Sequence, residues 1–223
     1  MKSLDVVRQA KLAGYEGGKS ALYAVIATVR PRKSRPLGHQ DKIPGEVVRH
    51  GVGQADVRFQ DGHIATVNFL VSRLEYSRWT AVSIINDQSL ETLLRALVGH
   101  LQQAGGVPFL SAFDRTKPIA ARTDQDGQVV EWDSAFAYAM VEIGVGVEIR
   151  ARRGAERGPG TNLANWVKQA FLRDRVFSSE IDLGRQLGEW LTAWNGAPCL
   201  EVGNRTPLAL LAEERQRLRP LRT

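Results

Sequence analysis

The sequence is poor in the residues that form covalent cross-links and metal clusters. It has one cysteine, Cys199, in 223 residues, which excludes an intrachain disulfide and a metal site built on cysteines. The histidines are few and scattered, and none has the short spacing of paired metal ligands. They stand at His39, His50, His63 and His100. We therefore expect neither a disulfide scaffold nor a zinc-cluster protein.

Long hydrophobic runs are also missing. No apolar stretch approaches the ~20 residues that a membrane-spanning helix needs, so we predict no membrane span. Residues 1–11 lack the apolar core of a signal peptide, and we therefore expect a cytoplasmic protein. Hydrophobic residues make up 43% of the chain, which is enough to bury the core of a globular protein of this length.

Positive charge is what the sequence has in excess. Thirty lysines and arginines against 24 acidic residues give a formal net charge of +6. An excess of this size is compatible with nucleic acid, an anionic membrane surface or an acidic partner. Most of the cations are arginines, whose planar guanidinium suits phosphate, so a phosphate-containing partner is favoured.

Residues 1–43 predict a helical module and a basic linker. Apolar residues at helical spacing flank a glycine-rich break at 14–18, so residues 1–30 form two helices. Two helices joined by a tight glycine turn are typical of part of a helix-turn-helix module, and equally of any helical hairpin. Residues 31–43 then carry prolines and several cations, which predicts either a segment that follows DNA phosphates or a solvated tether.

Residues 44–175 predict the main domain. Its elements follow the order three strands, helix, strand, helix, strand, helix, and an Asp61-Gly62 turn joins the first two strands. The first helix begins after Ser89 and ends at Gly105, and residues 107–113 form a buried strand. This is the order of an RNase H-like fold, so we predict an α/β protein with a mixed five-stranded sheet flanked by helices. Residues 176–223 predict a C-terminal helical region, with helices at about 180–194 and 207–218.

Asp114 stands directly after the buried strand 107–113. In open α/β sheets, ligands and metals bind at the carboxyl ends of such strands, so Asp114 is a candidate metal ligand. Alternatively, Asp114 only caps the strand and pairs with the nearby Arg115 or Lys117.

Several short motifs resemble, in order and spacing, those of the IstA-type transposases of bacterial insertion sequences, which carry a catalytic core like that of retroviral integrases. The motifs are Gly17–Tyr23, Pro44–Glu46, Ser72–Trp79, Gly105–Pro108, Phe113–Arg115, Trp166–Lys168, Thr206–Pro207 and Leu211–Glu214. The resemblance covers nearly the whole chain. The family's proteins are longer at the N-terminus, so this chain resembles one that begins inside the helix-turn-helix region.

The resemblance implies chemistry at three carboxylates, Asp, Asp and Glu, which hold two Mg²⁺ or Mn²⁺ ions. Only the second acid is retained, as Asp114; Gly51 stands at the position of the first, and Thr161 at that of the Glu. Thr161 suits the N-cap of a helix at 162–172 better than a metal site. Two nearby acids are poor substitutes, because Asp56 lies on the opposite face of a regular strand from Gly51 and Glu156 precedes the predicted helix.

These observations predict a transposase-like, DNA-binding protein of an insertion-sequence element that has lost strand-transfer activity. One alternative is an active two-metal transposase with substitute acids; another is an interaction module for a transposase multimer or an AAA+ ATPase helper. We expect a homo-oligomer, and DNA phosphate contacts from Arg30, Arg32, Lys33, Arg35, Lys117, Arg150, Arg152, Arg153, Arg157 and Lys168. For the interaction module, the sequence suggests an exposed charged tail of Glu213, Glu214, Arg215, Arg217, Arg219 and Arg222.

Overall fold

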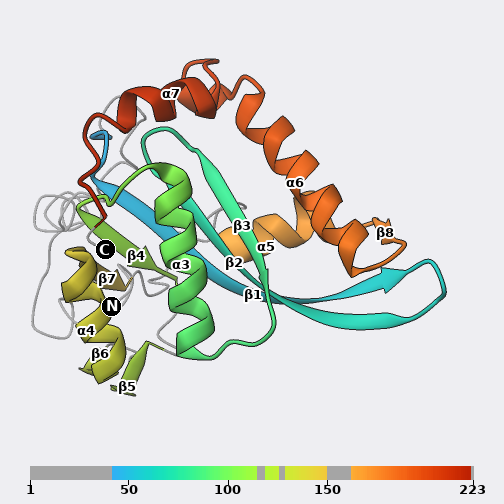
Figure 1. The fold of residues 1–223 in the computed structure, drawn as a ribbon, viewed down its shortest axis with the longest axis horizontal. Coiled ribbons are helices and arrows are strands. Elements are labelled where there is room, and N and C mark those ends of the chain that lie inside the picture. The colour runs from blue at the N-terminus through green and yellow to red at the C-terminus, as the bar shows by residue number, and fades with distance from the viewer. Residues whose placement is uncertain (1–41, 115–118, 126–128, 150–161, 222–223) are drawn as a thin grey trace, which may run out of the picture. The chain divides into compact units, whose positions relative to one another are not determined.

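The core of the protein is a mixed sheet built around one long strand. The computed structural model describes residues 42–114, 119–125, 129–149 and 162–221. The predicted N-terminal helices and most of the basic linker lie outside these residues. Strands β1 (Val47–Phe59), β2 (Ile64–Leu74) and β3 (Thr80–Ile85) form an antiparallel meander. Strands β4 (Leu110–Phe113) and β7 (Gly146–Ile149) join β1 in parallel, which gives the order β3-β2-β1-β4-β7 (Figure 1).

This order confirms the predicted RNase H-like sheet, and the structure adds four details. Strand β1 is one continuous strand of 13 residues. A short strand, β8 (Val176–Phe177), pairs with its far end and adds a sixth strand. A separate hairpin of β5 (Ala120–Thr123) and β6 (Val129–Trp132) precedes the second helix. Strand β4 begins at residue 110, because Val107 forms an isolated antiparallel bridge with Arg219 instead.

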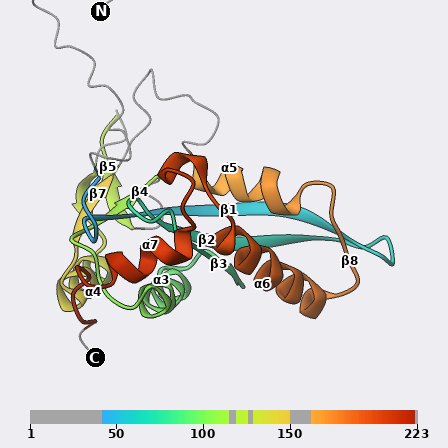
Figure 2. The same cartoon turned by 90° about the horizontal axis from the view of Figure 1, so that it is seen from above.

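Helices cover both faces of the sheet. Helix α3 (Leu90–Ala104) begins at the predicted cap Ser89 and ends at Gly105, which has a left-handed conformation (φ 92°). Helix α4 (Ser134–Ile143) lies beside α3, and α5 (Leu163–Val167) lies on the opposite side of the sheet (Figure 2). Among the described residues, none of the helices is both long and apolar enough for a membrane crossing.

The predicted helix at 162–172 changes form after its first turn. Residue Asn162, and not Thr161, caps it, by accepting a hydrogen bond from the backbone of Asn165. Helix α5 then continues as the π-helix η2 (Lys168–Leu172). The wider π turn places the consecutive residues Phe171 and Leu172 in the core. There the ring of Phe171 stacks on that of Trp190, with 5.1 Å between the ring centres.

The C-terminal helices run along one edge of the sheet. Helix α6 (Glu180–Gly196) covers edge strand β3, and the side-chain amide of Asn195 exchanges two hydrogen bonds with the backbone of Thr80. The short helix η3 (Leu200–Val202) leads into α7 (Pro207–Glu214). Because Asn195 binds the free backbone groups of the edge, strand β3 is closed to further pairing at that point.

Helix α7 ends at Glu214, four residues earlier than predicted, and the chain after it folds back onto the core. Glu214 is fully buried, and its carboxylate accepts hydrogen bonds from the backbone N–H of Gly45 and of Ser77. Arg215 donates to the carbonyls of residues 103 and 104 at the end of α3. Arg219 donates to the Pro108 carbonyl. The prediction of an exposed charged tail is therefore wrong for Glu214, and Arg215 and Arg219 hold the tail to the core.

The alternation of side chains along β1 and β2 divides the core into two layers. Phe69 and Val71 point toward α5 and α6, whereas Leu70, between them, points toward α3. A third, smaller cluster lies under α7 around Trp79 and Leu211. We call the two sides of the sheet the α5 face and the α3 face. The odd-numbered residues of β1 and β2 lie on the α5 face, which decides where the candidate site lies.

Candidate functional site

The candidate site lies on the α5 face where β1 and β4 run side by side. The backbone N–H of Asp114 donates to the His50 carbonyl at 3.2 Å and continues the parallel ladder of the two strands. Asp114 therefore follows β4 next to Gly51 of β1, and its side chain lies on the same face as Arg49. The structure thus brings Asp114 and Gly51 together, as the resemblance implied, whereas Thr161 is outside the described residues.

Gly51 leaves no room for a side chain. A Cβ atom built there would lie 3.2 Å from both the backbone nitrogen of Ala164 and the Cβ of Leu163, and 3.3 Å from a methyl of Val71. The first turn of α5 therefore packs directly on the backbone of β1. A larger residue at position 51 would have to push this helix away from the sheet.

We expect Gly51→Ala to destabilise the protein by about 1–3 kcal/mol, because the added methyl group overpacks the contact between β1 and α5. Gly99→Ala is the matched control. Position 99 lies inside α3 with no atom within 4 Å of an added Cβ, so the higher helix propensity of alanine should stabilise the fold by up to about 1 kcal/mol. Urea denaturation of both variants measures the difference. Equal effects of the two substitutions would contradict the packing argument.

Asp114 is paired with an arginine from the neighbouring strand. Its Oδ1 accepts a hydrogen bond from Nη2 of Arg49 at 2.8 Å, and both side chains are largely buried. Nε of Arg49 lies 3.9 Å from the Glu75 carboxylate. The other carboxylate oxygen of Asp114 is buried and has no hydrogen-bond partner. An ion pair for Asp114 was one predicted alternative, but the partner Arg49 is 65 residues away and was not predicted.

The described residues do not fit a divalent metal ion. Two-metal sites need several carboxylates that share the ions, and Asp114 already gives one oxygen to a guanidinium. Within the described ranges, no group of three or more His, Cys, Asp or Glu side chains could hold an ion. Gly51 is closed by α5, so an acid at that position would not fit without rearrangement.

Of the two acids that could substitute for a missing metal ligand, the structure describes Asp56. The register of β1 with β2 is unbroken from Val48 to Arg58, so no bulge turns Asp56 to the face of Gly51. Asp56 is exposed and accepts a hydrogen bond from the Thr66 hydroxyl at 2.7 Å. The other candidate, Glu156, lies outside the described residues, as does Thr161.

Of the predicted phosphate-binding residues, the structure describes only Lys168, the first residue of η2, which is half-buried. The others lie outside the described ranges, namely Arg30, Arg32, Lys33, Arg35, Lys117, Arg150, Arg152, Arg153 and Arg157. Their contacts with DNA stay predictions.

A group of cations on the α5 face was not predicted. Arg49 of β1 lies opposite Arg73 of β2, and Arg78 follows in the β2–β3 turn. Lys42 joins them, 3.8 Å from the Glu75 carboxylate that also faces Arg49. We call Lys42, Arg49, Arg73 and Arg78 the cationic cluster. No local sequence signal marks it, because its members come together only when β1, β2 and the turn are paired.

The opposite face of the same strands holds a buried polar chain. The Ser72 hydroxyl lies 2.8 Å from Nδ1 of His50 and 2.7 Å from Nδ1 of His100. Ser111 and Ser83 bind the outer nitrogens of the two rings at 3.3 and 2.9 Å. Burial lowers the pKa of His50 to about 3 and that of His100 to about 4, and the proximity of His100 contributes to the shift of His50. His50 is thus fully buried within the sheet.

Strand order and helix placement define an RNase H-like fold. The sequence is similar to that of a protein of Geobacillus stearothermophilus described as a transposase for insertion sequence element IS5376. The two are 25% identical over 198 residues, which is 88% of this chain and 47% of that protein. The chain therefore spans about half the length of this relative. No protein-family model matches the sequence.

Two solved structures align with most of the chain at low similarity. The catalytic core domain of HTLV-2 integrase, solved in complex with magnesium, aligns with 76% of this chain and 96% of its own, at 12% identity and a TM-score of 0.48. The intasome of simian T-cell lymphotropic virus aligns with 91% of this chain and 67% of its own, at 12% identity and a TM-score of 0.49. The resemblance to insertion-sequence transposases is thus confirmed at the level of the class, and the IstA type stays a prediction.

Proposed function

We propose that the chain is a DNA-binding module of an insertion-sequence transposase in which the RNase H-like site no longer performs metal-dependent strand transfer. Its similarity to a described transposase and its integrase-core fold support the transposase class. The net charge of +6 supports a nucleic-acid partner. Because the chain matches about half of that relative, activity of the whole relative is not transferred to it.

One observation carries the proposed loss of catalysis: the Asp114 carboxylate is bound to Arg49, and the neighbouring position that should supply an acid is a closed Gly51. A guanidinium placed on the carboxylate neutralises the charge that would attract an ion. The donor set around Asp114 then lacks the shared oxygens that two metal ions require. The role that fits this arrangement is binding of DNA without cleavage.

The proposal predicts salt-dependent DNA binding without metal-dependent cleavage. Fluorescence anisotropy with a labelled duplex should show binding at ~50 mM salt, with an affinity that falls linearly on a log–log scale as salt rises. Nicking of a terminal-repeat oligonucleotide in Mg²⁺ or Mn²⁺ should stay at the level of buffer alone. Failure to bind duplex, or binding without a salt dependence, would overturn the proposed DNA-binding role.

The same nicking assay, repeated with Asp114→Asn, distinguishes an active transposase from the proposed inactive one. Metal-dependent nicking by the wild type that this substitution abolishes would establish a catalytic site and refute the proposed loss. Without a catalytic role, Asp114→Asn should leave DNA affinity within about twofold and lower only the melting temperature, because it weakens the pair with Arg49. Light scattering tests the predicted homo-oligomer. The AAA+ ATPase helper stays a prediction from the resemblance.

A further inference from the structure

Arg73 forms no direct ion pair with a carboxylate among the described residues, and its nearest polar contacts are neutral. Its Nε donates to the Thr80 hydroxyl at 2.9 Å, and its guanidinium lies 4.0 Å from the ring centre of Trp166. The Nη2 atom is buried and has no hydrogen-bond partner. Burial and the nearby Arg78 lower the pKa of Arg73 to about 10. A ring face offsets part of the cost of burying a cation, but it does not satisfy the N–H donors, which favour an anion.

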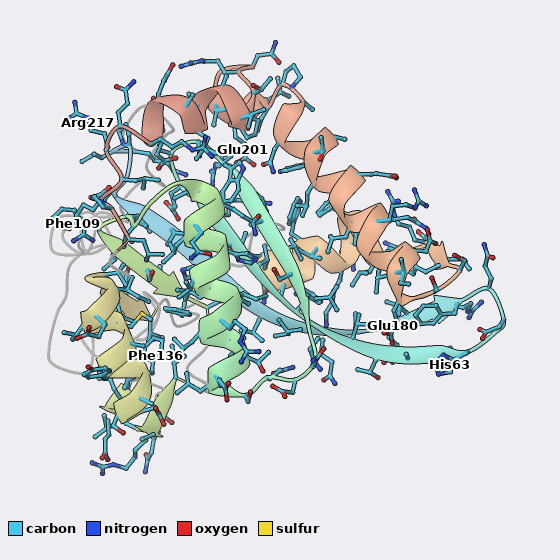
Figure 3. All side chains as sticks on the ribbon, viewed as in Figure 1. His63, Phe109, Phe136, Glu180, Glu201 and Arg217 are labelled. Carbon is cyan, nitrogen blue, oxygen red and sulfur yellow. The ribbon has the colours of Figure 1, made fainter. Side chains whose placement is uncertain are left out.

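Arg78 occupies a strained backbone position at the edge of the same cluster. Its φ is 63°, a left-handed conformation that glycine adopts readily and arginine rarely. Its Nε is also buried without a hydrogen-bond partner, and its Nη2 pairs at 2.9 Å with Glu201, whose side chain is 64% exposed. Glu201 lies in the short helix η3 between α6 and α7 (Figure 3). An exposed carboxylate is a partner that a stronger anion can displace.

The cluster is open to solvent at its edge and borders the candidate site. The side chains of Lys42, Arg49 and Arg78 keep between 12% and 22% of their surface exposed. Arg49 connects the cluster directly to Asp114. Burial and repulsion from Arg78 lower the pKa of Lys42, so the cations oppose one another at close range. Three carboxylates, those of Glu75, Asp114 and Glu201, pair with members of the cluster.

We infer that the cationic cluster is a binding site for a phosphodiester group of nucleic acid, which it would hold by guanidinium groups in place of metal ions. This inference rests on the proposed DNA-binding function and adds to it the place and the chemistry of a contact. Arginine forks bind phosphate oxygens through paired N–H donors, and the unsatisfied donors of Arg73 and Arg78 are of this kind. Binding requires that Glu201 moves away from Arg78 and that phosphate reaches the buried donors beneath it.

Arg78→Gly tests the site without threatening the fold, because glycine relieves the positive φ while it removes the cation. We expect an unchanged or higher melting temperature, duplex DNA affinity reduced about five- to tenfold at ~50 mM salt, and a salt slope smaller by about one. The matched control is Arg95→Gln, which removes an exposed arginine from α3 on the other face of the sheet. Equal losses in both variants would overturn the site, since only overall charge would then matter.

Glu201→Gln should change affinity in the opposite direction. Removing the carboxylate that competes for Arg78 should tighten duplex binding about two- to fivefold, because exposed pairs of this kind are weak and the freed guanidinium can bind phosphate. Glu189→Gln, which removes an exposed acid paired with Arg185 on α6, controls for net charge. No gain in affinity, or the same gain in both variants, would contradict the assignment.

A thermal-stability experiment with inorganic phosphate distinguishes failure of this site from failure of the proposed DNA-binding function. We expect millimolar phosphate to raise the melting temperature of the wild type more than chloride of equal ionic strength, and Arg78→Gly to abolish the difference. A phosphate effect without duplex binding would support the anion site and overturn the DNA-binding function. Duplex binding with no phosphate effect and no selective loss in Arg78→Gly would overturn the site and leave the function standing.

Discussion

Lowering the pH from about 7.5 to about 5 is expected to reduce the free energy of unfolding by about 4 kcal/mol, because two buried histidines must stay uncharged in the folded protein. In the unfolded chain each imidazole binds a proton below about pH 6.5, its ordinary pKa. In the folded protein His50 and His100 stay neutral until about pH 3 and about pH 4. Between these limits the unfolded state binds more protons, so stability falls as the pH falls.

The buried polar chain explains why the rings resist protonation. Ser72 lies between the two Nδ1 atoms, so its single proton can serve one ring while it accepts a hydrogen from the other. A charged ring would need acceptors on both sides, and two charged rings would repel each other across one hydroxyl. Serine hydroxyls bind all four ring nitrogens, so the described residues place no carboxylate there, and burial keeps bulk water away.

Urea denaturation at several pH values measures this loss, with a slope of about 2.5 kcal/mol per pH unit near pH 5.5 for the two rings. His100→Gln removes one titrating group and should halve the slope, even though it also lowers stability at neutral pH. His63→Gln is the control, because His63 lies exposed at the turn of the β1–β2 hairpin (Figure 3) and should leave the slope unchanged. A flat stability profile from pH 7.5 to 5 would contradict buried neutral rings.

Features encoded by neighbouring residues could be predicted from the sequence. The Asp61-Gly62 turn, the cap at Ser89 and the stop at Gly105 were predicted, because each depends on the backbone preference of one or two residues. The resulting order of strands and helices was enough to predict the RNase H-like sheet. The RNase H-like topology therefore followed from signals that are local in the sequence.

Features that depend on distant contacts could not be predicted. Strand β8 has only two residues and exists because they pair with the end of β1. The π turn of η2 depends on how Phe171 fits against Trp190 in the core. In both cases packing within the folded protein decides the local conformation, and no propensity of the segment itself indicates it.

The candidate site was predictable only in part. The resemblance indicated Gly51 as the neighbour of Asp114, and the β1–β4 register places them side by side. The partner of Asp114 was missed, because Arg49 reaches it across the sheet and is invisible at the level of sequence spacing. In the sequence Arg73 and Arg78 are only members of the motif Ser72–Trp79, and their unsatisfied donors appear only when burial is known.

Two glycines of the family motifs, Gly45 and Gly106, lie directly against the C-terminal segment. The sequence did not indicate this contact. A Cβ at Gly45 would lie 2.9 Å from the carbonyl oxygen of Arg217, and one at Gly106 would lie 2.6 Å from that of Arg219. Both glycines also have positive φ angles. The segment after α7 therefore lies directly on the backbone before β1 and before β4, and the buried Glu214 holds it there.

Replacing Glu214 with alanine is expected to destabilise the protein by about 3–5 kcal/mol. The carboxylate accepts the N–H groups of Gly45 and Ser77, so its removal leaves two buried donors unsatisfied at about 1–3 kcal/mol each, and it opens a cavity. Burial raises the pKa of the Glu214 carboxyl, while the hydrogen bonds from residues 45 and 77 oppose that shift. The two N–H groups thus compensate an acid that would otherwise be costly to bury.

Two further variants make the Glu214 experiment specific. Glu214→Gln keeps the size of the side chain but can accept only one of the two bonds, since its amide NH₂ faces the second donor, so an intermediate loss is expected. Glu213→Ala removes the adjacent exposed acid, which pairs with Arg205, and should destabilise the protein far less than Glu214→Ala. Hydrogen exchange should show faster exchange of the Val107 amide in Glu214→Ala, because its bond to the Arg219 carbonyl depends on docking of the tail. Similar losses for Glu213→Ala and Glu214→Ala would mean that the buried carboxylate does not hold the C-terminal segment to the core.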